Sequence, residues 1–323
     1  MPSRFRLRWR RYRRNNQIER YYQRLRRRRR NPQLDHAHLR APTNVAFNCN
    51  DSDIFDCAER QVASFLQRRP EVHDLDRRIS QVHETFRRSR LSRDGLISIL
   101  TQAPRASLAQ AQMDTSHHGY ANKHERLYEL IDFNDTIVDT ILTMADSSRA
   151  RFDERTKRAV DRICKRVGAP GFDETQWRAI IRGLTREVAV YLAAKSHGFV
   201  VYMTDRTRDA LGIDVQVKDP ESDRYINIDV KTPSSFRYRL DELAREGRLS
   251  ERERIVGDER GFIIEQTGRG VLKTQVIVLC ILPDKFGDLA DWQFVDSEPM
   301  RVTLSKLIRE FGLNDDKFGA IDA

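Results

Sequence analysis

The stretch Ile226-Asn227-Ile228-Asp229-Val230-Lys231, together with Gly212-Ile213-Asp214-Val215-Gln216-Val217 before it, decides the expected fold. Side chains alternate between the two faces of a β-strand, so each stretch predicts a strand with one apolar and one polar face. Residues 218–223 between them are typical of a hairpin turn. If the two strands pair, the carboxylates of Asp214 and Asp229 and the ammonium group of Lys231 converge on the polar face.

The neighbouring sequence predicts further elements around this hairpin. Asp173 and Gln176 have the spacing of a capping box, so a long helix is expected from Asp173 to about His197. The other expected elements are a helix at 153–167, a strand at 199–203, a helix at 238–246 and an apolar strand at 276–282. The resulting order is helix, three strands, helix, strand, which indicates an α+β or α/β domain over residues 151–323.

The converging groups have a chemical use. Two carboxylates and a backbone carbonyl, here that of Val230, form a hard oxygen site that suits Mg²⁺. Such a metal polarises a phosphodiester oxygen and lowers the pKa of a bound water. Lys231 can orient or deprotonate that water and offset the charge that builds on the phosphate.

One more acid comes from the long helix. Ile180, Leu184, Glu187 and Tyr191 follow one line along its surface, so Glu187 is expected at the edge of the apolar face. A carboxylate there is costly unless something binds it, and a metal would do so. The alternative is a glutamate that reaches solvent or pairs with a lysine or arginine.

These residues resemble the PD-(D/E)xK nuclease superfamily, in the order Glu187, Asp214 and Asp229-Val230-Lys231. The resemblance covers about residues 173–283 and implies a restriction-endonuclease-like αβββαβ core with a mixed central sheet. It implies that Asp214 and Asp229 bind Mg²⁺ or Mn²⁺, that Lys231 serves the attacking water, and that Glu187 is an accessory ligand. Asp214 follows Gly212-Ile213 rather than proline, a departure that the family tolerates. The alternative is a hairpin on which Asp and Lys pair in solvent.

The basic charge of the chain lies in an N-terminal arm, residues 1–35, which is expected to be disordered. Residues 1–31 hold 14 Arg and one acid, a net charge of +13, whereas the remainder sums to −3. Arginines neutralise phosphates and the interleaved aromatic rings can stack on bases, so the arm predicts a nucleic-acid contact, most simply with DNA. A solvated tail, an acidic membrane surface and a transit peptide remain alternatives. The densest run consists of Arg26, Arg27, Arg28, Arg29 and Arg30.

Other phosphate contacts are expected next to the strands. Arg237, Arg239 and Lys273 flank them and are candidates for nucleic-acid binding. Arg178, Arg182 and Arg186 follow one face of the long helix, opposite its apolar stripe, and are interpreted as a solvated face. Hydroxyls that follow the lysine are explained equally well by phosphate contact or by helix capping; they belong to Thr232, Ser234 and Ser235.

Residues 36–150 form a second region, helical from about residue 51, with breaks expected near Pro70, Pro104 and residues 110–122. It carries no catalytic signature and is interpreted as a structural module or a docking site for a protein partner. Three histidines of its polar loop are interpreted as surface residues rather than metal ligands. They are His117, His118 and His124.

The four cysteines are scattered, which argues against a zinc site or a disulfide framework and favours a reducing cytoplasm. No apolar run is long enough to span a membrane. The leading hypothesis is a Mg²⁺-dependent endonuclease or deoxyribonuclease, in which a homodimer would suit double-strand cleavage. The alternative is a catalytically inactive nucleic-acid-binding or assembly protein that acts through its arm.

Overall fold

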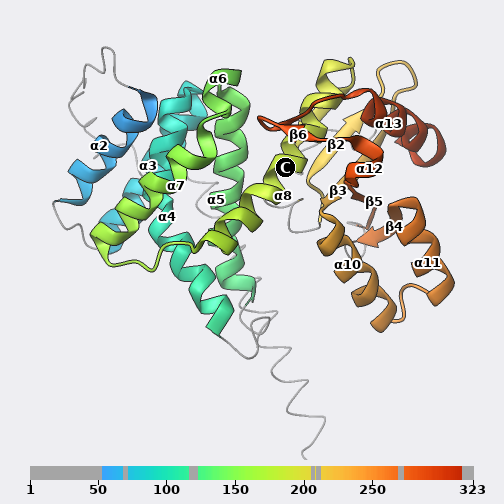
Figure 1. The fold of residues 1–323 in the computed structure, drawn as a ribbon, viewed down its shortest axis with the longest axis horizontal. Coiled ribbons are helices and arrows are strands. Elements are labelled where there is room, and N and C mark those ends of the chain that lie inside the picture. Colours follow the sequence, from blue (N-terminus) through green and yellow to red (C-terminus); the bar gives the residue numbers. More distant parts are fainter. Residues whose placement is uncertain are drawn as a thin grey trace, which may run out of the picture. The chain divides into compact units, whose positions relative to one another are not determined.

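The computed structural model describes residues 53–67, 72–115, 123–204, 208, 212–267 and 273–314. The first part is helical, as the sequence predicted (Figure 1). Its helices are α2 (Ile54–Leu66), α3 (Val72–Ser89), α4 (Ser92–Thr115), α5 (Lys123–Thr143), α6 (Asp146–Arg149) and α7 (Phe152–Val167).

Helix α4 is the centre of this helical part. It packs against α2, α3, α5 and α7, and residues 94–104 are all buried. Pro104 lies inside the helix, so the break predicted there is wrong. Packing on every side offsets the cost of about 3 kcal/mol that proline carries inside a helix. Gln102 Nε2 donates across the interface to Thr136 Oγ1 of α5, and within α4 to Ser98 Oγ, both at 3.0 Å.

Helix α8 (Glu174–Ser196) joins the helical part to a β-sheet. Its predicted capping box is confirmed, because Gln176 N donates to Asp173 Oδ1 at 2.7 Å and Asp173 N donates to Gln176 Oε1 at 2.8 Å. The first half of α8 packs in the helical core, through residues such as Trp177 and Leu184. The second half covers the sheet with small side chains, including Ala189 and Ala193. One helix therefore belongs to both cores.

The sheet is mixed, in the order β1-β2-β3-β5-β4. Strands β3 and β5 are parallel, and the other neighbours in this order are antiparallel. The predicted hairpin is confirmed, since β2 and β3 pair with Val215 opposite Ile228. The strands are β1 (Val200–Met203), β2 (Val215–Lys218), β3 (Arg224–Lys231), β4 (Phe262–Thr267) and β5 (Thr274–Cys280). Further short strands are β6 (Leu289–Ala290), β7 (Gln293–Phe294) and β8 (Leu313–Asn314), which pairs with β3.

Helices cover both faces of the sheet (Figure 1). Ile226, Ile228 and Val230 pack with α8 and α13 (Glu298–Phe311) on one face. On the other face, Val278 and Cys280 pack with α10 (Pro233–Arg245). Helix α11 (Glu251–Arg260) packs on α10 and β4, and α12 (Pro283–Phe286) packs on α13.

Several parts of this half differ from the expectations. Helix α10 begins directly after Lys231 rather than near Tyr238, because Thr232 caps it: its Oγ1 accepts from Ser235 N at 3.2 Å. The sequence also did not predict helices α11, α12 and α13 or strands β4, β6, β7 and β8. The capping box of α11, formed by Ser250 and Glu253, was present in the sequence as a signal. From α8 to β5, the element order is therefore helix, three strands, two helices and two strands.

Two further findings concern the cysteines and the apolarity of the helices. Cys57 is disulfide-bonded, which the scattered cysteines did not predict. Cys164 and Cys280 are free and buried. No helix in the described part of the chain is both long and apolar enough to cross a membrane.

Candidate active site

The polar face of β3 carries the predicted acid and lysine. Asp229 and Lys231 point away from the core that Ile226, Ile228 and Val230 share with α8 and α13, as the alternation predicted. The Asp229 side chain is almost fully buried, with 8% exposed, whereas that of Lys231 is 28% exposed. The two side chains form an ion pair. The candidate site therefore lies at the C-terminal end of β3.

Asp214 is held against this pair from the neighbouring strand. Its backbone N–H donates to Ile228 O at 2.9 Å. Its carboxylate Oδ2 accepts from Val230 N at 2.7 Å. Backbone and side chain of Asp214 thus bond to the residues on either side of Asp229, which fixes the two carboxyl groups side by side.

Burial and the neighbouring acid act together on Asp229. Burial raises the pKa of Asp229, and the charge of Asp214 and a side-chain hydrogen bond with Asp214 raise it further. The ion pair with Lys231 opposes this, and the resulting pKa is about 7. Two carboxylates this close together in a buried environment need a proton or a cation between them.

The pKa of Lys231 also departs from its ordinary value. Burial lowers the pKa of Lys231, but the negative charges of Asp214 and Asp229 outweigh burial, so that its pKa lies above the ordinary value. At neutral pH the lysine therefore holds its proton. Of the two roles that the sequence allowed, the structure favours orienting groups and offsetting negative charge over removing a proton from water.

A glycine turn lies next to the acids. Gly212 has φ +77°, a left-handed conformation that side chains rarely adopt. A Cβ atom there would lie 3.8 Å from Asp229 Oδ2. The turn into β2 thus places backbone directly beside the acid pair.

Glu187 is half-buried on α8, which packs on the opposite face of the sheet. Its charge contributes to the raised pKa of Lys231, as the smallest of the causes. Among the described residues no three His, Cys, Asp or Glu side chains lie close enough together to hold a metal ion. The carboxylates brought together are therefore Asp214 and Asp229, with Glu187 acting on Lys231 from further away.

The third oxygen of the expected metal site belongs to Val230. In a strand, the N–H and C=O of one residue point to the same neighbouring strand. Val230 N points to the Asp214 carboxylate, and the next carbonyl, that of Lys231, accepts from Ile281 N of the other neighbour at 3.0 Å. The Val230 carbonyl is thus expected on the Asp214 side, next to the two acids.

The predicted nucleic-acid contacts have different environments. Arg239 forms ion pairs with Glu265 and Glu242, so its guanidinium group is already paired within the protein. Arg237 is exposed and lies 3.6 Å from Asp258, and Lys273 is exposed. The arm from Arg26 to Arg30, His117, His118 and the side chain of His124 lie outside the described residues.

Sequence reasoning missed two buried amides on the same face of the sheet. Gln216 and Asn227 are opposite each other in β2 and β3, and Gln216 Nε2 donates to Asn227 Oδ1 at 2.7 Å. Asn227 Nδ2 donates in turn to Thr274 Oγ1 at 3.0 Å, which ties β3 to β5. Arg208 donates to Gln216 Oε1. The alternation that placed Asp214 and Asp229 also places these amides, and it was the available signal.

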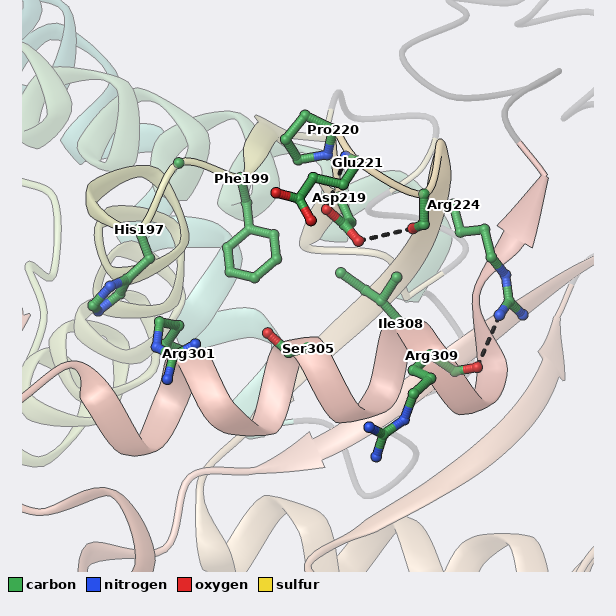
Figure 2. Close-up of a pocket in the computed structure, with 12 residues that line it drawn as sticks. His197, Phe199, Asp219, Pro220, Glu221, Arg224, Arg301, Ser305, Ile308 and Arg309 are labelled. Carbon is green, nitrogen blue, oxygen red and sulfur yellow. Dashed lines mark hydrogen bonds between the residues drawn. The ribbon is translucent and has the colours of Figure 1, made fainter.

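A cavity of about 490 Å³ opens elsewhere, among the hairpin turn, the end of α8 and α13 (Figure 2). It lies at the Arg224 end of β3, about 23 Å along the strand from Lys231. Arg224 Nη1 donates to Arg309 O at 2.8 Å, and Asp219 Oδ2 accepts from Ser222 Oγ at 2.8 Å. These polar groups are already hydrogen-bonded within the protein. The pair of acids at the end of β3 is therefore the better candidate for a functional site.

No protein-family model, curated protein or solved structure matches this chain. The case for a function therefore rests on the residues and their geometry.

Proposed function

We propose that this chain is a metal-dependent nuclease that hydrolyses phosphodiester bonds in nucleic acid, most simply DNA, with a PD-(D/E)xK-type, restriction-endonuclease-like core. The observation that carries the proposal is the convergence of Asp214, Asp229 and Lys231 at the ends of two paired strands. The element order α8, β1, β2, β3, α10 and later β5 supports it.

The donor set suits a divalent cation. Two adjacent carboxylates and a backbone carbonyl are hard oxygen ligands of the kind that Mg²⁺ and Mn²⁺ take. Burial and the negative charge of Asp214 raise the pKa of Asp229 to about 7, and a bound cation would relieve the cost of the ionised pair. Asp214, Asp229 and the carbonyl of Val230 would hold the metal, which supplies Lewis-acid polarisation of the phosphodiester and an activated water.

The protein groups have separate tasks in this proposal. The bond from Val230 N holds the Asp214 carboxylate in one orientation. Lys231, a cation at neutral pH, offsets negative charge on the phosphate that approaches the acids. The negative charge of Glu187 stabilises the protonated amine of Lys231. The arginine arm supplies affinity that does not depend on sequence, with the strong salt dependence of phosphate contacts.

Cleavage of plasmid, linear duplex and single-stranded DNA, and of RNA, with Mg²⁺, Mn²⁺ or EDTA tests the proposal. The expected result is metal-dependent cleavage that the double variant Asp229→Ala/Lys231→Ala loses while it still binds nucleic acid. A matched control is Glu310→Ala/Lys165→Ala, which removes one exposed acid and one exposed lysine outside the site. Cleavage that survives in the purified site variant would exclude this site.

The second candidate is a nucleic-acid-binding protein without catalysis. The observation in its favour is that no third acid lies close enough to complete a cluster among the described residues. The same assay distinguishes the two, because this candidate predicts binding without cleavage for the unaltered chain and both variants.

A further inference from the structure

The face of the sheet that carries the acid pair extends from β3 across β2 to the edge strand β1. In β1, the two neighbours of Tyr202, which are Val201 and Met203, pack against the core shared with α8 and α13. Tyr202 therefore points to the opposite face, which is that of the acid pair. On this face it lies next to Gln216 of β2, its register partner.

Tyr202 places an aromatic ring at the edge of this face. The residue is 48% exposed, and β1 is the last strand on its side of the sheet. An exposed ring can stack on an unpaired base of any sequence. A single exposed tyrosine is ordinary on a protein surface, so the groups beside it decide whether it has such a role.

Two hydrogen bonds hold Arg208 beside Asp214. The carbonyl of Arg208 accepts from the N–H of Ile213, directly before Asp214, at 3.0 Å. Its guanidinium Nη1 donates to Gln216 Oε1, two residues after Asp214. Gln216 is about 7 Å along the strand from Asp214. The guanidinium group therefore lies on the face of the acid pair, next to the register partner of Tyr202.

The group that receives this guanidinium is neutral and fixed in place. Gln216 carries no charge, so its bond positions Arg208 without neutralising it. Gln216 Nε2 donates to Asn227 Oδ1 at 2.7 Å, and both amides are at most 3% exposed. Asn227 Nδ2 donates in turn to Thr274 Oγ1 at 3.0 Å. A fully bonded network of buried amides is rigid, so it holds the arginine at a set distance from the acids.

Arg208 and Tyr202 together match the two parts of a nucleotide. The planar fork of an arginine binds a phosphate group through paired hydrogen bonds, and a tyrosine ring stacks on a base. Tyr202 and Gln216 stand on adjacent strands, about 5 Å apart, so the ring and the guanidinium can contact the same nucleotide. Stacking on a side chain requires a base that is not paired within a duplex.

We propose that Arg208 and Tyr202 bind the nucleotide that flanks the phosphodiester at the acid pair, with the arginine on its phosphate and the tyrosine stacked on its base. This inference rests on the proposed function for the identity of the ligand. It names the substrate class of that function, which is nucleic acid that is single-stranded next to the reacting phosphodiester. It also assigns the substrate strand a path from β3 across β2 to β1.

Equilibrium binding of a labelled single-stranded oligonucleotide to the full chain in EDTA tests the tyrosine without cleavage. Tyr202→Leu should weaken binding about 5- to 150-fold, because the stacking of one base is lost. Tyr202→Phe is the matched control, since it keeps the ring and should bind like the unaltered chain. On a duplex of the same sequence, Tyr202→Leu should lose much less affinity than on the single strand.

The salt dependence of the same binding tests the arginine. Loss of one phosphate contact in Arg208→Gln should lower the slope of log K against log salt by about 0.7, and Arg208→Lys should keep the slope. The control Arg178→Gln removes the same charge from an exposed position of α8 and should leave the slope near that of the unaltered chain. Tyr202→Leu removes no charge and should leave it there too.

The outcomes separate this inference from the nuclease proposal. Weaker binding by Tyr202→Leu but not Tyr202→Phe, and a lower slope for Arg208→Gln, support the subsite; if no form of the protein cleaves, they still do so and the nuclease is excluded. Unchanged affinity in Tyr202→Leu, an equal loss on duplex and single strand, or an unchanged slope in Arg208→Gln overturns the subsite, whether or not the chain cleaves. If Arg208→Gln fails to fold, the variants of the exposed Tyr202 decide the proposal alone.

Discussion

Replacing Asp229 by Asn should stabilise the metal-free protein at pH 8. Asparagine has nearly the same shape but carries no charge, so it removes the repulsion from Asp214 in a buried place. The folded pKa of about 7 lies above the ordinary value of 3.8. Between these values the folded chain keeps a proton that the unfolded chain has lost, so stability of the unaltered protein falls as pH rises from about 4 to about 7.

The size of the effect follows from the same shift. A difference of about three pH units corresponds to about 4 kcal/mol at pH 8, at 1.4 kcal/mol per unit. At pH 5 the corresponding difference is less than half as large. The advantage of Asp229→Asn should therefore grow by roughly 3 kcal/mol between pH 5 and pH 8, or roughly 5–10 °C in Tm for a chain of this size.

Thermal unfolding in EDTA at pH 5, 6, 7 and 8 measures this difference, with Glu310→Gln as an exposed control. Mg²⁺ at a hundred times its Kd should narrow the difference at pH 8, because it stabilises the unaltered chain by about 2.7 kcal/mol and has no complete site in the variant. A variant that is less stable than the unaltered chain at pH 8 in EDTA, or an advantage that does not change with pH, would refute the reasoning.

Three other changes test neighbouring parts of the account. Lys231→Met should lower the rate of metal-dependent cleavage by about 10²–10³-fold in single-turnover assays, since a charge next to the phosphate is lost; an unchanged rate would remove Lys231 from the chemistry. Glu265→Ala should cost about 3 kcal/mol in denaturant unfolding, because Glu265 is buried and pairs with Arg239 and Arg248; a loss below 1 kcal/mol would contradict this. Gly212→Ala should lower stability by about 1 kcal/mol or more through its positive φ, and an unchanged Tm would show that the turn does not need glycine.

The sequence predicted the local features of the site. Alternation along β3 separates Ile226 and Ile228 from Asp229 and Lys231, because neighbouring residues in a strand face opposite sides whatever the rest of the fold does. The capping box at Asp173 likewise depends on residues three positions apart. These predictions succeeded because each depends on a few adjacent residues.

Other features depend on residues far apart in the chain. Glu265, to which the sequence assigned no role, is buried and pairs with the half-buried Arg239 and the exposed Arg248, which are 26 and 17 residues away. Arg186 is half-buried and acts electrostatically on Cys280 of β5, which no helical periodicity reveals. Strand β4 was not predicted because apolar residues occupy both of its faces, so its sequence lacks the alternation of apolar and polar residues. Phe262 lies on the α8 side and Ile263 on the α10 side.

Calorimetric titration of the full chain with Mn²⁺ at pH 8 tests most directly whether Asp214 and Asp229 hold one cation together. The account predicts one site per chain that either Asp214→Asn or Asp229→Asn weakens by at least tenfold, while Glu310→Gln binds like the unaltered chain. Unchanged affinity and stoichiometry in both aspartate variants would contradict it.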